Sequence, residues 1–359
     1  MKRFISMLLA CMMVLTMCAC GGGNEAAEPT PEVTATPEVT AAPVERPTAQ
    51  PAPQYVNPLN GEILDAPYTG RVFASTICNT ENAIPHMAVN EADVMFEMFV
   101  NGGVIRNLAL FTDIRSVERF GSVRSTRPAF HQLAGIYDLI VLHSGGSTYS
   151  LNDIRKLGYD NFNIDMWDIK NSGAAYRDTE FGRTYEATLF GYGEGCYNYA
   201  ESKGMRLEQP ADKDYGLDFT DEGTPAEGEI ANTVKMDFNY YGNSKITEMK
   251  YNADLDKYVY NQYGQEMRDL VTNEPEAFTN VIAIKAKLYI EDIYQKADYA
   301  KGGEGWYACG GKLIPITWSS ENGKSPLEFF KEDGTPLELE RGNTYIGIMP
   351  DKHSTVNWG

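Results

Sequence analysis

The sequence is poor in cysteine, histidine and basic residues, and it contains no apolar run of membrane-spanning length. Among its 359 residues are 6 cysteines and 4 histidines, and Lys plus Arg total 31 against 50 for Asp plus Glu, which gives a formal net charge of −19. Nucleic acid and anionic membrane surfaces repel such an acidic chain, so we expect no nucleic-acid partner. A membrane span needs about 20 apolar residues, which argues against a permanent transmembrane helix.

The cysteines and histidines are also badly placed for metal binding. Three cysteines precede residue 21, and the other three, Cys78, Cys196 and Cys309, are widely separated. An odd, scattered set is a poor disulfide framework, and the histidines show no paired spacing. We therefore expect no metal site and no cofactor, and we predict that the three later cysteines are small core residues.

What the chain does contain is enough apolar sequence for a real core, because 43% of its residues are hydrophobic and 11% are aromatic. Global disorder is excluded, and the length suits two domains. The predicted organisation is a signal peptide over 1–19, a lipidated Cys20 with a disordered Pro/Thr/Glu-rich tether over 20–56, an α/β domain over 57–206, an acidic linker over 207–230, and a β-rich domain over 231–359.

The N-terminus is typical of a secretory signal, with Lys2 and Arg3 before an apolar run over residues 4–15. The run ends in Met17-Cys18-Ala19-Cys20-Gly21, which resembles the bacterial lipobox, where a small residue precedes the cysteine. This resemblance implies a diacylglyceryl thioether on Cys20, and so a protein anchored on the extracytoplasmic face of the bacterial cell membrane. The alternative is ordinary secretory cleavage beside a coincidental cysteine.

The segment after Cys20 has the composition of a spacer. It is rich in Pro, Thr, Ala and Glu, the sequence Thr-Pro-Glu-Val-Thr-Ala occurs twice in succession from Thr30, and the first aromatic residue is Tyr55. Such a segment cannot bury enough apolar surface to offset the entropy of ordering its backbone. We predict an extended tether.

The pattern from residue 57 onward predicts an α/β domain with a mixed sheet. Residues 93–100 and 104–111 read as two strands joined by a glycine turn, and 138–143 reads as a buried strand. Residues 128–136 follow Arg127 with a proline in the first helical turn, and 147–157 is amphipathic and stops at a glycine. Strands and helices that alternate in this way favour a layered fold with some parallel pairing.

Four stretches resemble the YerB-like family of bacterial envelope lipoproteins, which has two linked domains of unknown function. They are Asn57-Pro58-Leu59-Asn60-Gly61-Glu62, Glu97 with Gly102-Gly103-Val104-Ile105-Arg106, Gly121-Ser122-Val123-Arg124-Ser125-Thr126-Arg127-Pro128, and His143-Ser144-Gly145-Gly146-Ser147. The resemblance implies an envelope location and a two-domain fold, and it implies no reaction.

The C-terminal part predicts a mostly antiparallel β domain. Acidic residues dominate 207–230, and short β-type runs separated by turn pairs such as Asp333-Gly334 follow from 234 to 349. No helical segment of comparable strength occurs there. The glycine-rich run 191–195 lacks a dinucleotide-binding pattern, and we interpret it as a loop.

The clearest candidate for chemistry is a set of arginines before the predicted helix at 128. Arg124 and Arg127 flank Ser125 there, and Arg106 lies on a predicted strand. Guanidinium groups near a helix N-terminus suit carboxylates and phosphates. The alternative is that these arginines pair with the domain's own carboxylates, Glu97 and Asp113 among them.

Two further groups extend this candidate site. His143-Ser144-Gly145-Gly146 follows a buried strand, where α/β sheets place ligands. Arg177 and Asp178 lie in a segment that also contains Trp167. Its mix of aromatic side chains and carboxylates suits the binding of a sugar ring. The alternative is a solvated loop with one buried tryptophan. The predicted ligand-binding residues are Arg106, Arg124, Ser125, Arg127, His143, Ser144, Gly145, Gly146, Arg177 and Asp178.

Three functions remain open from the sequence. The preferred one is a non-catalytic, lipid-anchored protein that binds an anionic envelope ligand, such as a wall-polymer phosphate or a peptide carboxylate. The second is a cell-wall hydrolase or transferase with His143 as base and Asp178 or Glu97 as its partner. The third is a scaffold for other envelope proteins, which requires an exposed apolar patch.

Overall fold

The computed structural model describes residues 54–359, so the predicted signal peptide, Cys20 and nearly all of the predicted tether lie outside the described residues. The α-helices are α1 (Pro128–Tyr137), α2 (Thr148–Leu157), α3 (Trp167–Asn171) and α4 (Gly193–Ser202). Short 3₁₀ turns cover η1 (Glu81–Ala83), η2 (Ile114–Ser116), η3 (Tyr185–Ala187), η4 (Tyr299–Lys301) and η5 (Glu321–Gly323). None of the helices in this part of the chain has the length and apolar character that crossing a membrane demands.

A 13-stranded mixed sheet forms the centre of the fold. Its path is β12 (Glu229–Ile230), β22 (Lys312–Ser319), β21 (Gly303–Cys309), β18 (Asn280–Ala286), β25 (Thr344–Pro350), β4 (Val94–Asn101), β5 (Val104–Phe111), β3 (Phe73–Ile77), β7 (Ile140–His143) and β8 (Asn161–Asn163). Beside that path lie β19 (Leu288–Glu291), β20 (Tyr294–Ala297) and β23 (Glu328–Phe330).

Four further sheets occur within residues 54–359. The larger one is antiparallel and consists of β16 (Gln265–Glu266), β15 (Lys257–Gln262), β14 (Asn243–Asn252), β13 (Thr233–Tyr240), β26 (Thr355–Trp358) and β17 (Ala277–Phe278). The smaller ones are β6 (Phe120–Gly121) with β10 (Leu189–Gly191) and β9 (Ala175–Arg177), β1 (Tyr55–Val56) with β2 (Ile63–Leu64), and β11 (Asp218–Thr220) with β24 (Glu338–Glu340).

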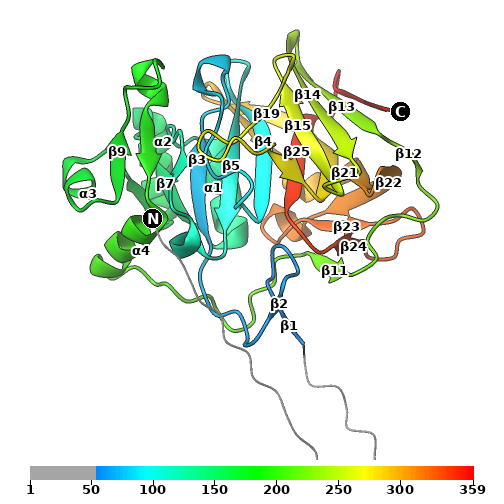
Figure 1. Ribbon diagram of the computed structural model, residues 1–359, viewed down its shortest axis with the longest axis horizontal. Helices are drawn as coiled ribbons and strands as arrows, with labels where there is room; N and C mark the ends of the chain where they lie inside the picture. The colour runs from blue at the N-terminus through cyan, green and yellow to red at the C-terminus, as the bar shows by residue number, and fades with distance from the viewer. Residues whose placement is uncertain (1–53) are drawn as a thin grey trace, which may run out of the picture. The chain divides into compact units, whose positions relative to one another are not determined.

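The predicted fold class is confirmed, with a mixed sheet in the N-terminal region and mostly antiparallel strands in the C-terminal region. One feature was not predicted. The C-terminal strand β25 pairs in parallel with the N-terminal strand β4, so the strands of both regions share one sheet. In Figure 1 the red β25 accordingly runs beside the cyan β4, although their residues are far apart in sequence.

The two faces of the shared sheet carry different neighbours because side chains alternate along each strand. On β4, Val94, Phe96 and Met98 belong to a core cluster with residues of α1. Met95 and Phe99 point to the opposite face and pack against the sheet of β13–β15. Glu97 has the same parity as Met95 and Phe99, and it therefore enters the second interface.

Several local predictions hold. The hairpin β4–β5, the helices α1 and α2, and the left-handed Gly158 that ends α2 (φ 73°) lie where the patterns placed them. Cys78, Cys196 and Cys309 are free and buried. The loop interpretation of 191–195 is wrong, because α4 begins at Gly193 directly after β10.

Candidate functional site

The fold brings three of the predicted arginines together, and we call Arg106, Arg124 and Arg127 the arginine cluster. Arg106 comes from β5 and shares the parity of Leu108, which packs toward α1. Arg124 and Arg127 belong to the segment between β6 and α1, and Arg127 is the N-cap residue of α1. Arg106 donates from Nη1 to the Ser125 carbonyl oxygen at 2.8 Å, which ties β5 to this segment.

The hydrogen bonds of the cluster go to neutral acceptors. Arg127 donates from Nε to Asn101 Oδ1 at 3.1 Å and from Nη1 to the Thr126 carbonyl at 2.8 Å. Arg124 donates from Nη1 to the Glu186 carbonyl at 3.3 Å, and its Nε is buried with no partner among the described residues. Each guanidinium has five N–H groups, so most donors of the cluster are unused within residues 54–359.

The alternative that these arginines pair with Glu97 or Asp113 is wrong. Glu97 forms its ion pair with Lys245, and Asp113 accepts a hydrogen bond from the Arg115 backbone N–H at 3.2 Å. Within the described residues, no carboxylate lies within ion-pairing distance of Arg106, Arg124 or Arg127. The cluster therefore carries uncompensated positive charge.

The pKa values of the arginine cluster also reflect positive charge that lacks a negative partner. Arg106 is only 5% exposed, and burial together with the charges of Arg127 and Arg124 lowers its pKa to about 9. Burial and Arg124 also lower the pKa of Arg127. A bound anion would relieve this repulsion, because an opposite charge favours the protonated form of each guanidinium.

The serine–glycine segment after β7 borders the same place. The Ser144 N–H donates to the Arg124 carbonyl at 2.9 Å, and the Thr126 N–H donates to the Gly145 carbonyl at 3.0 Å. These bonds bring Ser144, Gly145 and the neighbouring Gly146 against residues 122–127, which we call the arginine segment. The helix α2 begins just beyond, so the N-termini of α1 and α2 both lie near the cluster and add positive potential.

A tyrosine from the C-terminal region lies against the arginine cluster. Tyr294 on β20 lies with its ring centroid 5.8 Å from the Arg127 guanidinium carbon, and its hydroxyl donates to Ser147 Oγ at 2.5 Å. This neighbour belongs to the other half of the chain. No pattern in the sequence points to it.

His143 does not contribute a free side chain to this site, contrary to the prediction. It is 1% exposed, its Nδ1 lies 2.8 Å from the Gly145 carbonyl, and its Nε2 lies 3.1 Å from Asn161 Oδ1. Both ring nitrogens lie against protein oxygens and the ring is buried, so His143 packs beneath the Gly145 turn and cannot reach a ligand. Neither Asp178 nor Glu97 contacts its ring, so the predicted hydrolase pairing is also wrong.

The burial of His143 predicts a loss of stability in acid. Burial lowers its pKa from the ordinary value of 6.5. Below pH 6.5 the unfolded chain therefore binds more protons than the folded protein, and the free energy of unfolding falls as the pH decreases. Urea titrations between pH 7.5 and pH 5 should show this fall, with a smaller slope in His143→Asn; an unchanged slope would contradict the assignment.

Arg177 and Asp178 lie on β9 and just after it, and they do not join the cluster. The Arg177 guanidinium pairs with Asp165 (Nε to Oδ1, 3.1 Å), donates to the Tyr185 carbonyl at 2.7 Å, and stacks on the Tyr185 ring at 3.9 Å. The Asp178 carboxylate accepts the Glu180 N–H at 2.9 Å. Arg177 is thus charge-compensated. Trp167 is 76% exposed, so the expectation of a buried tryptophan here is wrong.

A hydroxyl–imidazole–carboxylate relay does occur beside the cluster, and it was not predicted. Thr126 Oγ1 lies 2.9 Å from His131 Nε2, and His131 Nδ1 lies 2.6 Å from Asp153 Oδ2. Thr126 is completely buried, so its hydroxyl is closed to an external substrate. The relay instead fixes the arginine segment to α1 and α2.

A buried polar network on the opposite face of the shared sheet was not predicted from the sequence. Glu97 is fully buried, and five side-chain donors approach its two oxygens. They belong to Asn79, Lys245, Thr247, Tyr260 and Tyr345. The only sequence signal was an acidic residue within the apolar run 93–100.

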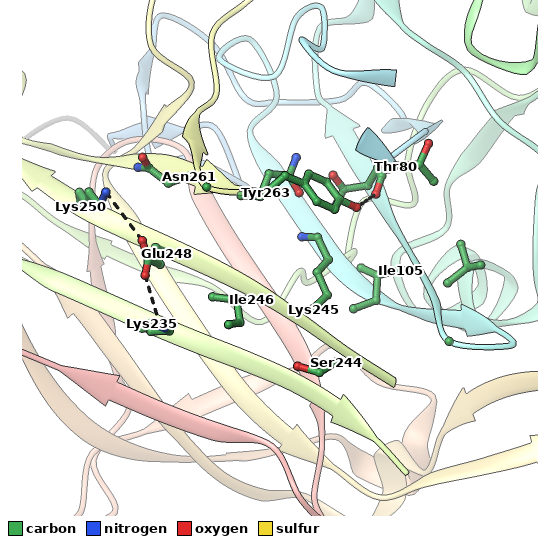
Figure 2. A pocket seen from close by; sticks show the side chains of 15 residues that line it. Thr80, Ile105, Lys235, Ser244, Lys245, Ile246, Glu248, Lys250, Asn261 and Tyr263 are labelled. Carbon is green, nitrogen blue, oxygen red and sulfur yellow. Dashed lines mark hydrogen bonds and ion pairs between the residues drawn. The ribbon is translucent and has the colours of Figure 1, made fainter. Parts of the chain in front are cut away.

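This network borders a cavity of about 610 Å³ formed by β14, the end of β15 and the turn of the β4–β5 hairpin. Figure 2 shows Lys245 and Tyr263 with Thr80 and Ile105 at one end of the cavity. Glu248 lies between Lys235 and Lys250 at the other end. The arginine cluster does not line this cavity.

Comparison with known proteins gives matches over most of the chain. The N-terminal domain of "Protein of unknown function (DUF3048)" matches residues 59–206, and its C-terminal domain matches residues 236–346. The chain is 27% identical over 301 residues to "Putative lipoprotein YerB" of Bacillus subtilis (strain 168), which covers 80% of this chain and 87% of that protein. The crystal structure of YerB protein from Bacillus subtilis has a TM-score of 0.71 and 24% identity, over 84% of this chain and 99% of the solved one. The two structures share a fold.

Proposed function

The chain belongs to the DUF3048 family, and we propose that it is a lipid-anchored protein that binds an anionic ligand of the bacterial cell envelope through its arginine cluster. The observation that carries this proposal is the absence, among residues 54–359, of any carboxylate partner for Arg106, Arg124 and Arg127. In a chain with a net charge of −19, such a local excess of positive charge suits an external anion.

The proposed anchor is a diacylglyceryl group on Cys20, which lies outside the described residues. Its support is the basic start, the short apolar run and the lipobox-like Ala19-Cys20-Gly21 of the sequence, together with the name of the similar lipoprotein. Two acyl chains bury enough methylene groups to hold a folded domain at a membrane, at ~0.8 kcal/mol per group. The protein then acts on the extracytoplasmic face, within reach of its tether.

The proposed ligand carries more than one negative charge. Three guanidiniums lie near one another and near the N-termini of α1 and α2, so a single carboxylate would leave most of the positive charge unbalanced. A phosphate of a wall polymer balances more of it than a peptide carboxylate does, and it accepts bidentate bonds from arginine. The backbone groups of Ser125, Ser144 and Gly145 hold this position in shape, because Ser125 accepts from Arg106, Ser144 donates to the Arg124 carbonyl and Gly145 donates to Asn163 Oδ1.

The test is a titration of the full chain with a purified phosphate-containing wall polymer and, separately, with wall peptides. Hydrogen bonds to charged groups contribute about 1.5–3 kcal/mol each, so an Arg124→Ala/Arg127→Ala double variant should bind the polymer at least about 100-fold more weakly. The affinity of the unchanged protein should also fall with added salt.

A matched double variant, Arg155→Ala/Lys156→Ala, removes two cations from the last turn of α2 and should bind as the unchanged protein does. Equal affinity of the Arg124→Ala/Arg127→Ala variant and the unchanged protein for the polymer would overturn the proposal. Preference for wall peptides over the polymer would overturn the choice of phosphate.

The scaffold alternative stays a prediction. Its candidates are the exposed Trp167, at 76%, and Tyr185, at 64%, which lie beside the Asp165–Arg177 pair, and the exposed Ile290 and Ile293 of the β19–β20 hairpin.

A further inference from the structure

The cavity beside the Glu97 network is a second place where the protein can hold a ligand, and it is separate from the arginine cluster. At about 610 Å³ it has the size of a typical small-molecule site. The two sites are distinct because Arg106, Arg124 and Arg127 do not line the cavity, and Arg106 instead donates to the Ser125 carbonyl. Ligand binding in this cavity therefore does not depend on the proposed function.

Lys245 supplies a free donor at one end of this cavity. Its ammonium carries three N–H groups, and its described acceptors are Glu97 and the Thr247 hydroxyl at 2.9 Å. The side chain is 10% exposed and lines the cavity, so the third N–H is available there. Figure 2 shows the Lys245 amine directed toward the space beside Tyr263.

Lys245 can stay paired with Glu97 while it also contacts a ligand. A carboxylate has about four lone-pair directions, whereas five side-chain donors approach Glu97. A ligand acceptor can therefore share Lys245 while the other donors keep Glu97 satisfied. Asn79 also lines the cavity, is 1% exposed, and has an Oδ1 without a partner among the described residues.

The walls combine flat apolar surface with neutral polar groups. Tyr263 is 40% exposed, and its hydroxyl donates to the Asn79 carbonyl at 2.9 Å, which fixes the orientation of the ring. Val104, Ile105 and Ile246 add aliphatic surface, and Thr80, Ser244 and Asn261 add hydrogen-bonding groups. A sugar ring has the matching chemistry, with C–H faces for the aromatic ring and hydroxyl edges for the polar groups.

The rim of the cavity carries net positive charge. Lys235 and Lys250 share one carboxylate, that of Glu248, at 3.6 Å and 3.7 Å. One of these two lysine charges is therefore left without compensation at the rim, which favours a ligand with a carboxylate. We propose that this cavity binds a short acidic saccharide, with its ring on Tyr263, a polar substituent at Lys245 and its carboxylate at the Lys235–Lys250 rim.

The test is a calorimetric titration of the full chain with the disaccharide of N-acetylglucosamine and N-acetylmuramic acid, which carries one carboxylate, and with the neutral disaccharide chitobiose. Tyr263→Ala removes an apolar contact and should lower the affinity about tenfold. Lys250→Glu reverses a charge at the rim and should lower the affinity about fivefold. The unchanged protein should prefer the acidic disaccharide to chitobiose by a similar factor.

Two matched variants control for general effects. Tyr241→Ala removes another exposed tyrosine at a left-handed turn position (φ 48°, against 52° for Tyr263), and it should leave the affinity unchanged. Lys203→Glu reverses another exposed lysine whose carboxylate partner is 3.7 Å away, as for Lys250, and it should also bind normally.

Four results would overturn the inference. They are no measurable binding of the acidic disaccharide, equal binding of chitobiose, unchanged affinity in both Tyr263→Ala and Lys250→Glu, and loss of saccharide binding in the Arg124→Ala/Arg127→Ala variant. The last result would move the saccharide to the arginine cluster.

Discussion

Replacing Lys245 with methionine is expected to lower the free energy of unfolding by about 3–5 kcal/mol, because the change leaves a buried carboxylate without its cation. Glu97 is fully buried, and Lys245 is its only ion-pair partner among the described residues. The remaining donors are hydroxyl and amide groups, which do not neutralise a charge. Urea titration followed by circular dichroism measures the effect directly.

The double variant Glu97→Gln/Lys245→Met removes both charges and should recover part of the lost stability, since replacing a whole buried pair costs less than removing one partner. Lys250→Met is the matched control. It removes an exposed lysine of the same strand, and surface pairs contribute only about 0–1 kcal/mol. A loss below about 1 kcal/mol in Lys245→Met would mean that Glu97 is not a buried, charged carboxylate in the folded protein.

The partner of Glu97 is Lys245, and this pairing could not be predicted from the sequence. The two residues are 148 positions apart, and the parallel contact of β25 with β4 brings the C-terminal strands over the N-terminal hairpin. Periodicity predicts single strands well, because it depends on which residues alternate. It says nothing about which distant strands become neighbours, and Tyr294 beside Arg127 was missed for the same reason.

The register of the hairpin shows what could have been predicted. Glu97 lies opposite Asn107, and Arg106 lies opposite Met98, so Glu97 and Arg106 occupy adjacent registers and point to opposite faces of the sheet. The predicted hairpin of 93–100 and 104–111 already contained this information. A Glu97–Arg106 ion pair was therefore excluded by strand alternation, whereas the true partner of Glu97 required the tertiary structure.

The arginine and histidine predictions differ in outcome because they rest on different physics. Arg124 and Arg127 lie close together because both precede the start of α1. This helix start could be predicted, because it follows from local sequence. The availability of His143 depended on its surroundings, and Asn161 and the Gly145 carbonyl occupy both its ring nitrogens. Burial and hydrogen-bond satisfaction are properties of the packed structure, and a single sequence does not contain them.

The glycine-rich run 191–195 shows the same limit at a strand–helix junction. Glycine in a run predicts a loop when only conformational freedom is considered. Gly193 instead opens α4, and its N–H donates to the Val117 carbonyl at 3.0 Å. Its backbone lies so close to η2 that no side chain fits, so the reason for the glycine is close approach.

This close approach gives the second large expected effect. A Cβ at position 193 would lie 1.9 Å from the Ile114 carbonyl oxygen and 2.4 Å from the Val117 carbonyl oxygen, and both are backbone atoms that cannot rotate away. Overpacking typically costs 1–3 kcal/mol, and Gly193→Ala should lower the free energy of unfolding by about 3 kcal/mol or more because the backbone itself must shift.

Asn198→Ala is the matched control, since it places alanine at an exposed position of the same helix, where alanine raises helix propensity. Chemical denaturation of both variants separates the steric effect from any general effect of alanine in α4. Equal stability of the two variants would mean that α4 does not lie against η2. That contact fixes α4 to the segment that precedes β6, and the chain continues from β6 into the arginine segment. A shift of α4 in Gly193→Ala should therefore also weaken anion binding.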